Sequence, residues 1–276
     1  MFASLESLFS LTNQTAVIIG GSGGLGRDMA LALALAGARV AVLGRRMEAC
    51  EYVVDQIRAE GREALAVACD VLDKATLLLA ARQIESELGQ VDILVNAAGG
   101  NQAGATTSAT QEFFDLENVT MDSVMATNFT GTLLACQVFG RTMAARKQGV
   151  IVNITSMSGL RPLTRVGVYG AAKSAVINFT QWLAVHMALE YSPHIRVNAL
   201  APGFFLTEQN RFLLINPETS AWTERGEKIV AHTPLRRLGV AHDLTSTLLW
   251  LVSPASAFVT GVVVPVDGGF SAYSGV

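Results

Sequence analysis

Short, continuous apolar runs alternate with longer helical patterns along this chain, and this alternation constrains the fold more than any other feature. The candidate strands, rich in Val, Ile, Leu and Ala, are 16–19, 40–43, 64–67, 93–95, 150–154, 196–199 and 262–266. The helical stretches between them lie near 25–36, 47–60, 73–88, 120–146, 168–190 and 241–252. Strands without polar alternation are typical of parallel sheets that are covered on both faces. The pattern therefore predicts an α/β fold in a single domain, 1–276, built on a doubly wound parallel sheet.

The alternation is broken once, between Pro202 and about Pro234. This stretch mixes aromatic and polar residues and is too long for an ordinary connection. It follows the C-terminal end of a predicted strand, which is the edge where ligands bind in open parallel sheets. We expect a helical substrate lid at about 203–234. The alternative is a surface insertion without a role.

The composition describes an apolar chain with little charge. Of the 276 residues, 50% are hydrophobic and 16% are charged, and the net charge is -3. These values exclude a disordered protein and give no sign of a nucleic-acid surface. The cysteines Cys50, Cys69 and Cys136 lack a metal-binding spacing, so we expect free thiols and no metal site. With no bilayer-spanning run and no secretory signal pattern, we expect a cytoplasmic protein without membrane or nucleic-acid partners.

A glycine-rich loop joins the first predicted strand to the first predicted helix. It fits two registers: Gly21, Gly23 and Gly26 match G-x-G-x-x-G, whereas Gly20, Gly24 and Gly26 match G-x-x-x-G-x-G. Glycines let the backbone approach a pyrophosphate closely, and the helix N-terminus attracts the anion. The loop therefore predicts dinucleotide binding, and the loop alone leaves both registers open.

The end of the second predicted strand bears on the choice of cofactor. A carboxylate there would bind the 2′-hydroxyl of the adenosine ribose, and none is present. Gly44 instead leaves space, and Arg45 or Arg46 could pair with a 2′-phosphate. This favours NADP over NAD. The alternative is that both arginines are solvated surface residues.

A set of polar residues suggests acid–base chemistry on an alcohol or ketone. Tyr169 and Lys173 are four residues apart on one predicted helix face, and a nearby ammonium should lower the pKa of the phenol. Ser156 follows the C-terminal end of a predicted strand, where its hydroxyl can bind a substrate oxygen. Asn128 lies within a predicted helix and could hold a water that relays protons to Lys173. Asn96 follows the fourth strand, on the cofactor side of the sheet.

With these residues the chain resembles the short-chain dehydrogenase/reductase family over its whole length. The matching elements are Gly20, Gly24, Gly26, Asp70, 96–99, Asn128, Ser156, Tyr169, Lys173, Pro202 and Gly203. The resemblance selects the register Gly20, Gly24 and Gly26. It also implies a seven-stranded Rossmann-type sheet and a homotetramer, with two-fold interfaces formed by the helices near 120–146 and 168–190 and by the apolar C-terminal strand.

The resemblance also implies roles for individual residues. Tyr169 would be the general acid/base, Lys173 would lower its pKa and bind the nicotinamide ribose, Ser156 would position the substrate oxygen, and Asn128 would hold the relay water. The implied cofactor-binding residues are Gly20, Ser22, Gly24, Leu25, Gly26, Arg45, Arg46, Asp70, Val71, Asn96, Gly99, Tyr169, Lys173, Pro202, Gly203 and Thr207.

The segments 179–186, 201–207 and 266–276 resemble the D-mannonate oxidoreductase (fructuronate reductase) branch, a relative of gluconate 5-dehydrogenases. The implied reaction interconverts D-fructuronate and D-mannonate with NAD(P). A sugar acid needs a cation for its carboxylate and hydrogen-bonding groups for its hydroxyls. The candidates are Asn101, Ser156, Arg165, Gln209, Asn210 and Arg211. Of these, Arg211 or Arg165 would pair with the carboxylate.

Other functions stay open for this sequence. The same fold would serve a gluconate 5-dehydrogenase-like enzyme or a 3-ketoacyl reductase. A dinucleotide-sensing binding protein without chemistry is a third alternative. The complete set Asn128, Ser156, Tyr169 and Lys173 argues against that last one.

Overall fold

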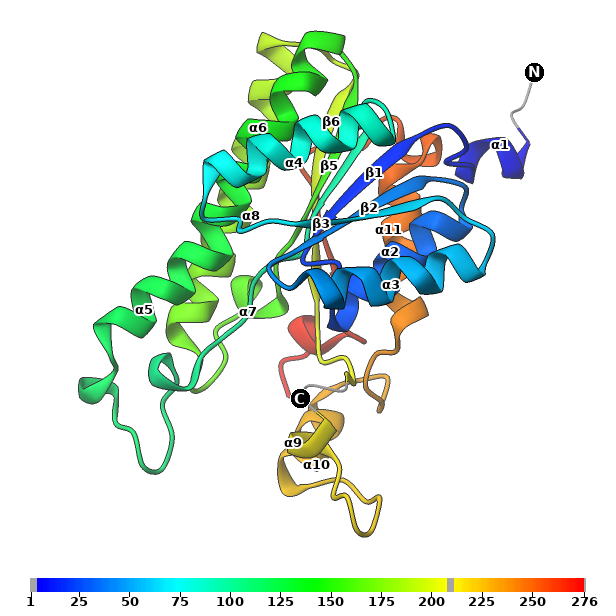
Figure 1. The fold of residues 1–276 in the computed structure, drawn as a ribbon. Coiled ribbons are helices and arrows are strands. Elements are labelled where there is room, and N and C mark those ends of the chain that lie inside the picture. The colour runs from blue at the N-terminus through cyan, green and yellow to red at the C-terminus, as the bar shows by residue number, and fades with distance from the viewer. Residues whose placement is uncertain (1–3, 208–210, 276) are drawn as a thin grey trace.

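Seven parallel strands form one sheet at the centre of the molecule (Figure 1). The computed structural model describes residues 4–207 and 211–275. The order across the sheet is β3-β2-β1-β4-β5-β6-β7, which confirms the predicted doubly wound topology. The strands are β1 (Thr15–Ile19), β2 (Arg39–Gly44), β3 (Ala64–Ala68), β4 (Ile93–Asn96), β5 (Gly149–Ile154), β6 (Ile195–Pro202) and β7 (Val263–Val266).

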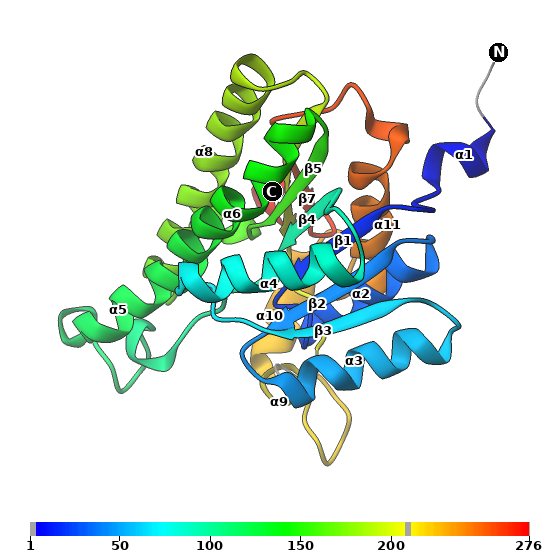
Figure 2. The same cartoon turned by 45° about the horizontal axis from the view of Figure 1, so that its top comes forward.

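Helices cover both faces of the sheet, which explains why the strands are apolar throughout (Figures 1 and 2). One core lies under α2 (Gly24–Leu35), α3 (Met47–Ala59) and α11 (Ala241–Val252). The opposite core lies under α4 (Lys74–Glu87), α6 (Gly131–Arg146) and α8 (Gly167–Glu190). Successive residues of a strand face opposite sides, so Ile18 of β1 belongs to the first core and Val17 to the second.

The helix expected near 120–146 is present, and it contains one π-helical turn. It consists of α5 (Asn118–Met125), a π-helical turn η3 (Ala126–Thr130) and α6. Asn128 lies in this turn and is fully buried. Single π-helical turns often accompany functional sites.

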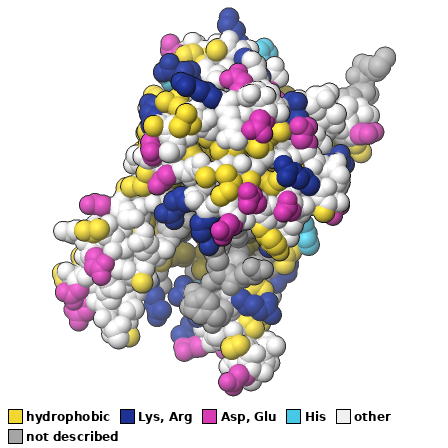
Figure 3. All heavy atoms as spheres, viewed as in Figure 1, with side chains coloured by type: hydrophobic (Ala, Val, Ile, Leu, Met, Phe, Trp, Pro, Cys, Tyr) yellow, Lys and Arg dark blue, Asp and Glu magenta, His cyan; other side chains and the backbone are white. Residues whose placement is uncertain are grey.

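Several short elements were not resolved by the sequence pattern. They are α1 (Leu5–Phe9), η1 (Ala103–Ala105), η2 (Phe113–Asp115), α7 (Met157–Leu160), η4 (Pro254–Ser256) and η5 (Phe270–Ala272). No helix in the described part of the chain is long and apolar enough to cross a membrane. On the face shown in Figure 3, acidic and basic side chains are interspersed over most of the surface.

The segment expected to be the lid forms a small lobe beyond the C-terminal edge of the sheet (Figure 1). It contains α9 (Arg211–Leu214) and α10 (Glu224–His232) and has its own apolar core of Leu214, Ile229 and Leu238. This small core is separate from the two cores that cover the faces of the sheet.

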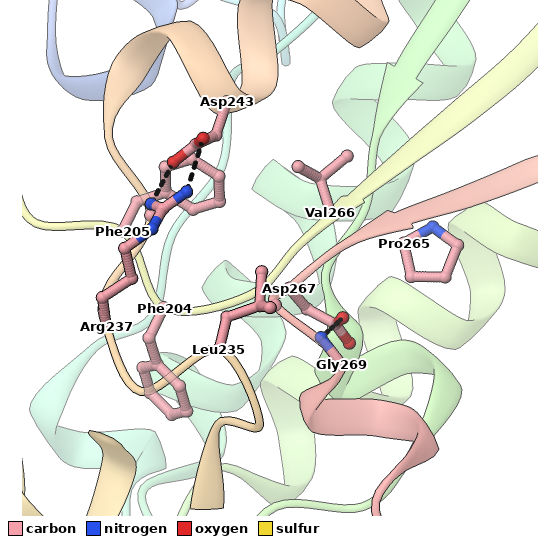
Figure 4. A pocket seen from close by; sticks show the side chains of 11 residues that line it. Phe204, Phe205, Leu235, Arg237, Asp243, Pro265, Val266, Asp267 and Gly269 are labelled. Carbon is pink, nitrogen blue, oxygen red and sulfur yellow. Dashed lines mark hydrogen bonds and ion pairs between the residues drawn. The ribbon is translucent and has the colours of Figure 1, made fainter.

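The two ends of this lobe are tied to each other, and the leaving end is tied to α11. Phe205 and Gly239 form a parallel bridge between the entering and leaving chain. Arg237 makes two hydrogen bonds with Asp243 near the start of α11, and the Nη2–Oδ1 distance is 2.9 Å. Figure 4 shows this pair beside Phe205, with a cavity between it and the 265–269 stretch. The base of the lobe is therefore fixed on the sheet side.

Candidate active site

Tyr169 and Lys173 lie one turn apart at the beginning of α8. Lys173 is only 4% exposed, and its Nζ donates a 2.9 Å hydrogen bond to the carbonyl of Ile154 at the end of β5. The Nζ atom lies 5.6 Å from the centre of the Tyr169 ring. The structure thus brings the predicted pair together at the C-terminal edge of the sheet.

The electrostatics of the pair differ from the expectation. Burial raises the pKa of Tyr169, and its hydrogen bond with Ser156 only partly opposes that effect. Burial also lowers the pKa of Lys173 to about 8. The predicted lowering of the phenol pKa by Lys173 is therefore not found. The reason is that both groups lose water, and the ammonium bonds to a backbone carbonyl.

Ser156 links this pair to the end of β5. It is the N-cap of α7, and its Oγ accepts a 3.2 Å hydrogen bond from the amide of Ser158. The preceding Thr155 donates a 2.8 Å hydrogen bond to the carbonyl of Lys173. This contact fixes α8 against β5, and it was missed because neither the position of Thr155 nor its type predicts a partner 18 residues away.

Asn128 holds the turn that follows β4. Its Oδ1 accepts from the amide of Gly100 at 3.1 Å, and its Nδ2 donates to the carbonyls of Gly100 and Val124 at 2.7 and 2.8 Å. A Cβ on Gly99 would lie 2.4 Å from Asn128 Oδ1 and 3.1 Å from Lys173 Nζ, so all three residues meet here. Both amide hydrogens of Asn128 are thus committed to the backbone. Its relay water stays a prediction.

The side chain of Asn96 faces the interior and not the cofactor edge. It is 3% exposed and donates to Asn153 Oδ1 at 2.8 Å and to Cys136 Sγ at 3.3 Å. Asn153 in turn donates to Thr180 Oγ1 at 2.9 Å. The cofactor contact predicted for Asn96 stays a prediction, and with the side chain turned inward it would come from the backbone. Strand alternation directs this residue toward α6 and α8.

The glycine loop has the geometry of an anion cradle at the start of α2. A Cβ on Gly26 would lie 2.1 Å from the carbonyl oxygen of Gly20, and Gly20 has a φ of +79°. Gly23, which only the other register uses, has extended backbone that any residue adopts. The N-cap of α2 makes no side-chain hydrogen bond, so its amides are available to a pyrophosphate. These residues fit a dinucleotide.

The side chains of Ser22 and Cys50 crowd the end of β2 at Gly44. A Cβ on Gly44 would lie 2.7 Å from Ser22 Oγ and 3.1 Å from Cys50 Sγ. Arg45 and Arg46 follow and are exposed. The space predicted at Gly44 is therefore partly occupied by the Ser22 hydroxyl. Asp70, at the end of β3, accepts a 3.0 Å hydrogen bond from the amide of Leu72.

The candidate substrate residues lie in two places: on the segment before α8 together with the loop after β4, and in the lobe. Arg165 and the loop carrying Asn101 are joined, because the amide of Thr107 donates a 3.0 Å hydrogen bond to the carbonyl of Arg165. Arg211 begins α9 in the lobe and is exposed. Gln209 and Asn210 lie outside the described residues. Among the residues that the structure describes, no group of three His, Cys, Asp or Glu could hold a metal ion.

Known proteins with this architecture match almost the whole chain. The uncharacterized oxidoreductase UxuB of Bacillus subtilis is 48% identical over 276 residues, covering 97% of this chain and 98% of that protein. A crystal structure of a candidate D-mannonate oxidoreductase from Haemophilus influenza with bound NAD is 40% identical. It superimposes with a TM-score of 0.91 over 99% of this chain and 100% of that chain.

A second solved structure is a gluconate 5-dehydrogenase from Burkholderia cenocepacia in complex with NADP and tartrate. It is 31% identical, with a TM-score of 0.87 over 98% of this chain and 100% of that chain. The model of the short chain dehydrogenase family matches residues 14–216. The chain therefore belongs to the short-chain dehydrogenase family.

Proposed function

We propose that this NAD(P)-dependent oxidoreductase interconverts a keto sugar acid and its alcohol, with D-fructuronate and D-mannonate as the pair. The observation that carries the reaction type is the meeting of Ser156, Tyr169 and Lys173 at the C-terminal edge of the sheet. The similarity to the candidate D-mannonate oxidoreductase supports the substrate. Lys and Arg side chains also border the hollow between the α5 and α9–α10 ends in Figure 3, as an anionic substrate requires.

In the proposed reduction, a hydride from the bound nicotinamide adds to the carbonyl carbon, and a proton reaches the carbonyl oxygen. Tyr169 donates this proton, and Ser156 holds the substrate oxygen through its hydroxyl. The Lys173 ammonium stabilises the phenolate that remains. Asn128 keeps the 99–100 turn against Lys173. In the oxidation direction Tyr169 takes the proton back.

For the cofactor we propose a preference for NADP. Its support is the absence of a carboxylate at the end of β2 and the two exposed arginines that follow. The pyrophosphate would lie on the amides at the start of α2, and Thr207 would approach the carboxamide. The remaining proposed contacts are those named from the sequence, with Asn96 acting through its backbone.

We also propose that the 203–234 lobe is a lid on a single catalytic domain. It follows β6 directly, and its separate apolar core allows it to close as one piece. Trp222 is 39% exposed, and its ring lies against Gly226 within this lobe.

The proposed assembly is a homotetramer in the cytoplasm. The outer face of α8 is uncharged over Ser174, Asn178, Trp182, Val185 and Leu189, as suits a helix that packs on a copy of itself. The three cysteines are buried free thiols, which is compatible with a reducing compartment. Light scattering on the purified protein should give four times the 29.2 kDa chain mass. A monomeric mass would exclude the tetramer.

Steady-state kinetics with fructuronate and tagaturonate, each with NADH and NADPH, test the substrate and the cofactor together. We expect the highest kcat/KM for fructuronate with NADPH. Gluconate oxidation should be measured in parallel, because the similarity to a gluconate 5-dehydrogenase favours it as the second candidate. A 3-ketoacyl thioester serves as the control substrate. Faster turnover of gluconate or the thioester would replace the proposed substrate, and faster turnover with NADH would reverse the cofactor preference.

A further inference from the structure

Arg165 has a backbone conformation that costs free energy. Its φ is +73°, in the left-handed region that favours glycine. Non-glycine residues in this region are uncommon, and they persist where the surrounding structure enforces them. A glycine at this position would adopt the same turn without strain. The presence of arginine therefore needs an explanation in its side chain.

The backbone on both sides of Arg165 is held in place. Its carbonyl accepts a hydrogen bond from the amide of Thr107 at 3.0 Å. The next residue, Val166, is the N-cap of α8, and its carbonyl accepts from the amide of Gly170 at 2.9 Å. These contacts involve only main-chain atoms, so they would be kept by glycine. They fix the position of Arg165 four residues before Tyr169.

The side chain of Arg165, in contrast, has no structural partner. It is exposed, and it makes no hydrogen bond or ion pair with any residue that the structure describes. Structural arginines of this protein behave differently: Arg146 pairs with Asp92, Arg237 pairs with Asp243, and Arg196 donates to buried carbonyls. On a strained, pinned backbone four residues before Tyr169, this unpaired guanidinium is free to bind an anionic ligand.

The hydrogen bond from Thr107 also determines what lies near Arg165. It ties the segment before α8 to the loop after β4, in which Asn101 donates to Thr106 Oγ1 at 2.8 Å. A cation and an amide are thus carried by two segments that are joined to each other, one of which leads into α8 with Tyr169. A planar guanidinium matches a carboxylate with two parallel hydrogen bonds, and an amide matches a hydroxyl.

We propose that Arg165 binds the carboxylate of the substrate and so selects sugar acids over neutral sugars. The strained turn is retained because it presents this side chain, in preference to Arg211 of the lobe. This inference rests on the proposed function, because it requires a carboxylate-bearing substrate. Arg165 is a specificity residue, and it takes no part in proton or hydride transfer.

The test compares Arg165→Gly, Arg165→Ala and Arg165→Lys with wild type. Loss of a charge-assisted hydrogen bond should raise KM for fructuronate roughly 10- to 100-fold in the Gly and Ala variants, with kcat nearly unchanged. Lysine should retain part of the affinity. For the methyl ester of fructuronate, which lacks the charge, wild type and variants should have similar KM values. KM for NADPH should not change.

Stability tests the backbone strain at position 165 separately from ligand binding. Glycine removes the left-handed strain and alanine keeps it, so Arg165→Gly should melt no lower than Arg165→Ala. At most positions glycine is instead less stable than alanine.

Arg161 is the matched control: it is an exposed arginine of the same segment with a φ of −136°, and Arg161→Ala should leave KM unchanged. An unchanged KM in Arg165→Gly would overturn the inference. A wild-type protein inactive on fructuronate would overturn the proposed function instead.

Discussion

Replacing Tyr169 by phenylalanine should lower kcat for ketone reduction by about a thousandfold, because proton transfer from a positioned side chain contributes 10²–10⁴-fold. Phenylalanine keeps the ring against Lys173 and removes only the proton donor. The dissociation constant of the cofactor should therefore stay close to the wild-type value. Single-turnover reduction followed by loss of nicotinamide absorbance measures the chemical step directly.

The matched control for this variant is Tyr191→Phe. Tyr191 follows the last residue of the same helix and is 48% exposed, far from the catalytic group along α8. It should turn over substrate at the wild-type rate. If Tyr169→Phe and Tyr191→Phe were equally active, Tyr169 would not be the proton donor, and a dinucleotide-binding protein without this chemistry would become the better description.

Most strands of the sheet could be predicted, because a strand that is buried on both faces is apolar throughout its sequence. Val17 and Ile18 face opposite cores, so β1 has no polar alternation and differs clearly from a surface strand. The glycine loop was equally informative, because Gly26 lies too close to Gly20 for any side chain. The loop does not reveal which register it uses, and only the backbone geometry and the family pattern distinguish them.

The features that could not be predicted depend on contacts between residues that are far apart in the sequence. Asn96 bonds to Asn153 and Cys136, which come from β5 and α6, so its inward direction follows from the assembled sheet. The π-helical turn at Asn128 interrupts a pattern that is helical on both sides. The raised pKa of Tyr169 depends on desolvation, which is a property of the folded site and not of the Tyr–Lys spacing.

Replacing Lys173 by methionine should separate stability from activity. Turnover should fall on the order of a hundredfold or more, because the ammonium that stabilises the phenolate is lost. The fold should tolerate the change, since methionine fills a similar volume and carries no charge into the interior. One cost remains, because the carbonyl of Ile154 loses its donor.

The pH dependence of the free energy of unfolding tests, without any substrate, whether Lys173 is buried away from water. The pKa of Lys173 is lowered from 10.5 to about 8 in the folded protein. Between these values the unfolded chain binds more protons, so wild-type stability should rise with pH through this window. Below pH 8 the folded protein carries the full cost of a buried charge, about 3 kcal/mol. Lys173→Met lacks this group, so its stability relative to wild type should be greatest near pH 7.

Chemical denaturation of the cofactor-free protein at several pH values provides the measurement. The difference in free energy of unfolding, wild type minus Lys173→Met, should increase by about 3 kcal/mol between pH 7.5 and 10.5. Lys147→Met, at an exposed lysine that follows α6, should show no such change. Parallel pH curves for wild type and Lys173→Met would mean that water reaches Lys173. The ammonium would then be too well solvated to act strongly on Tyr169.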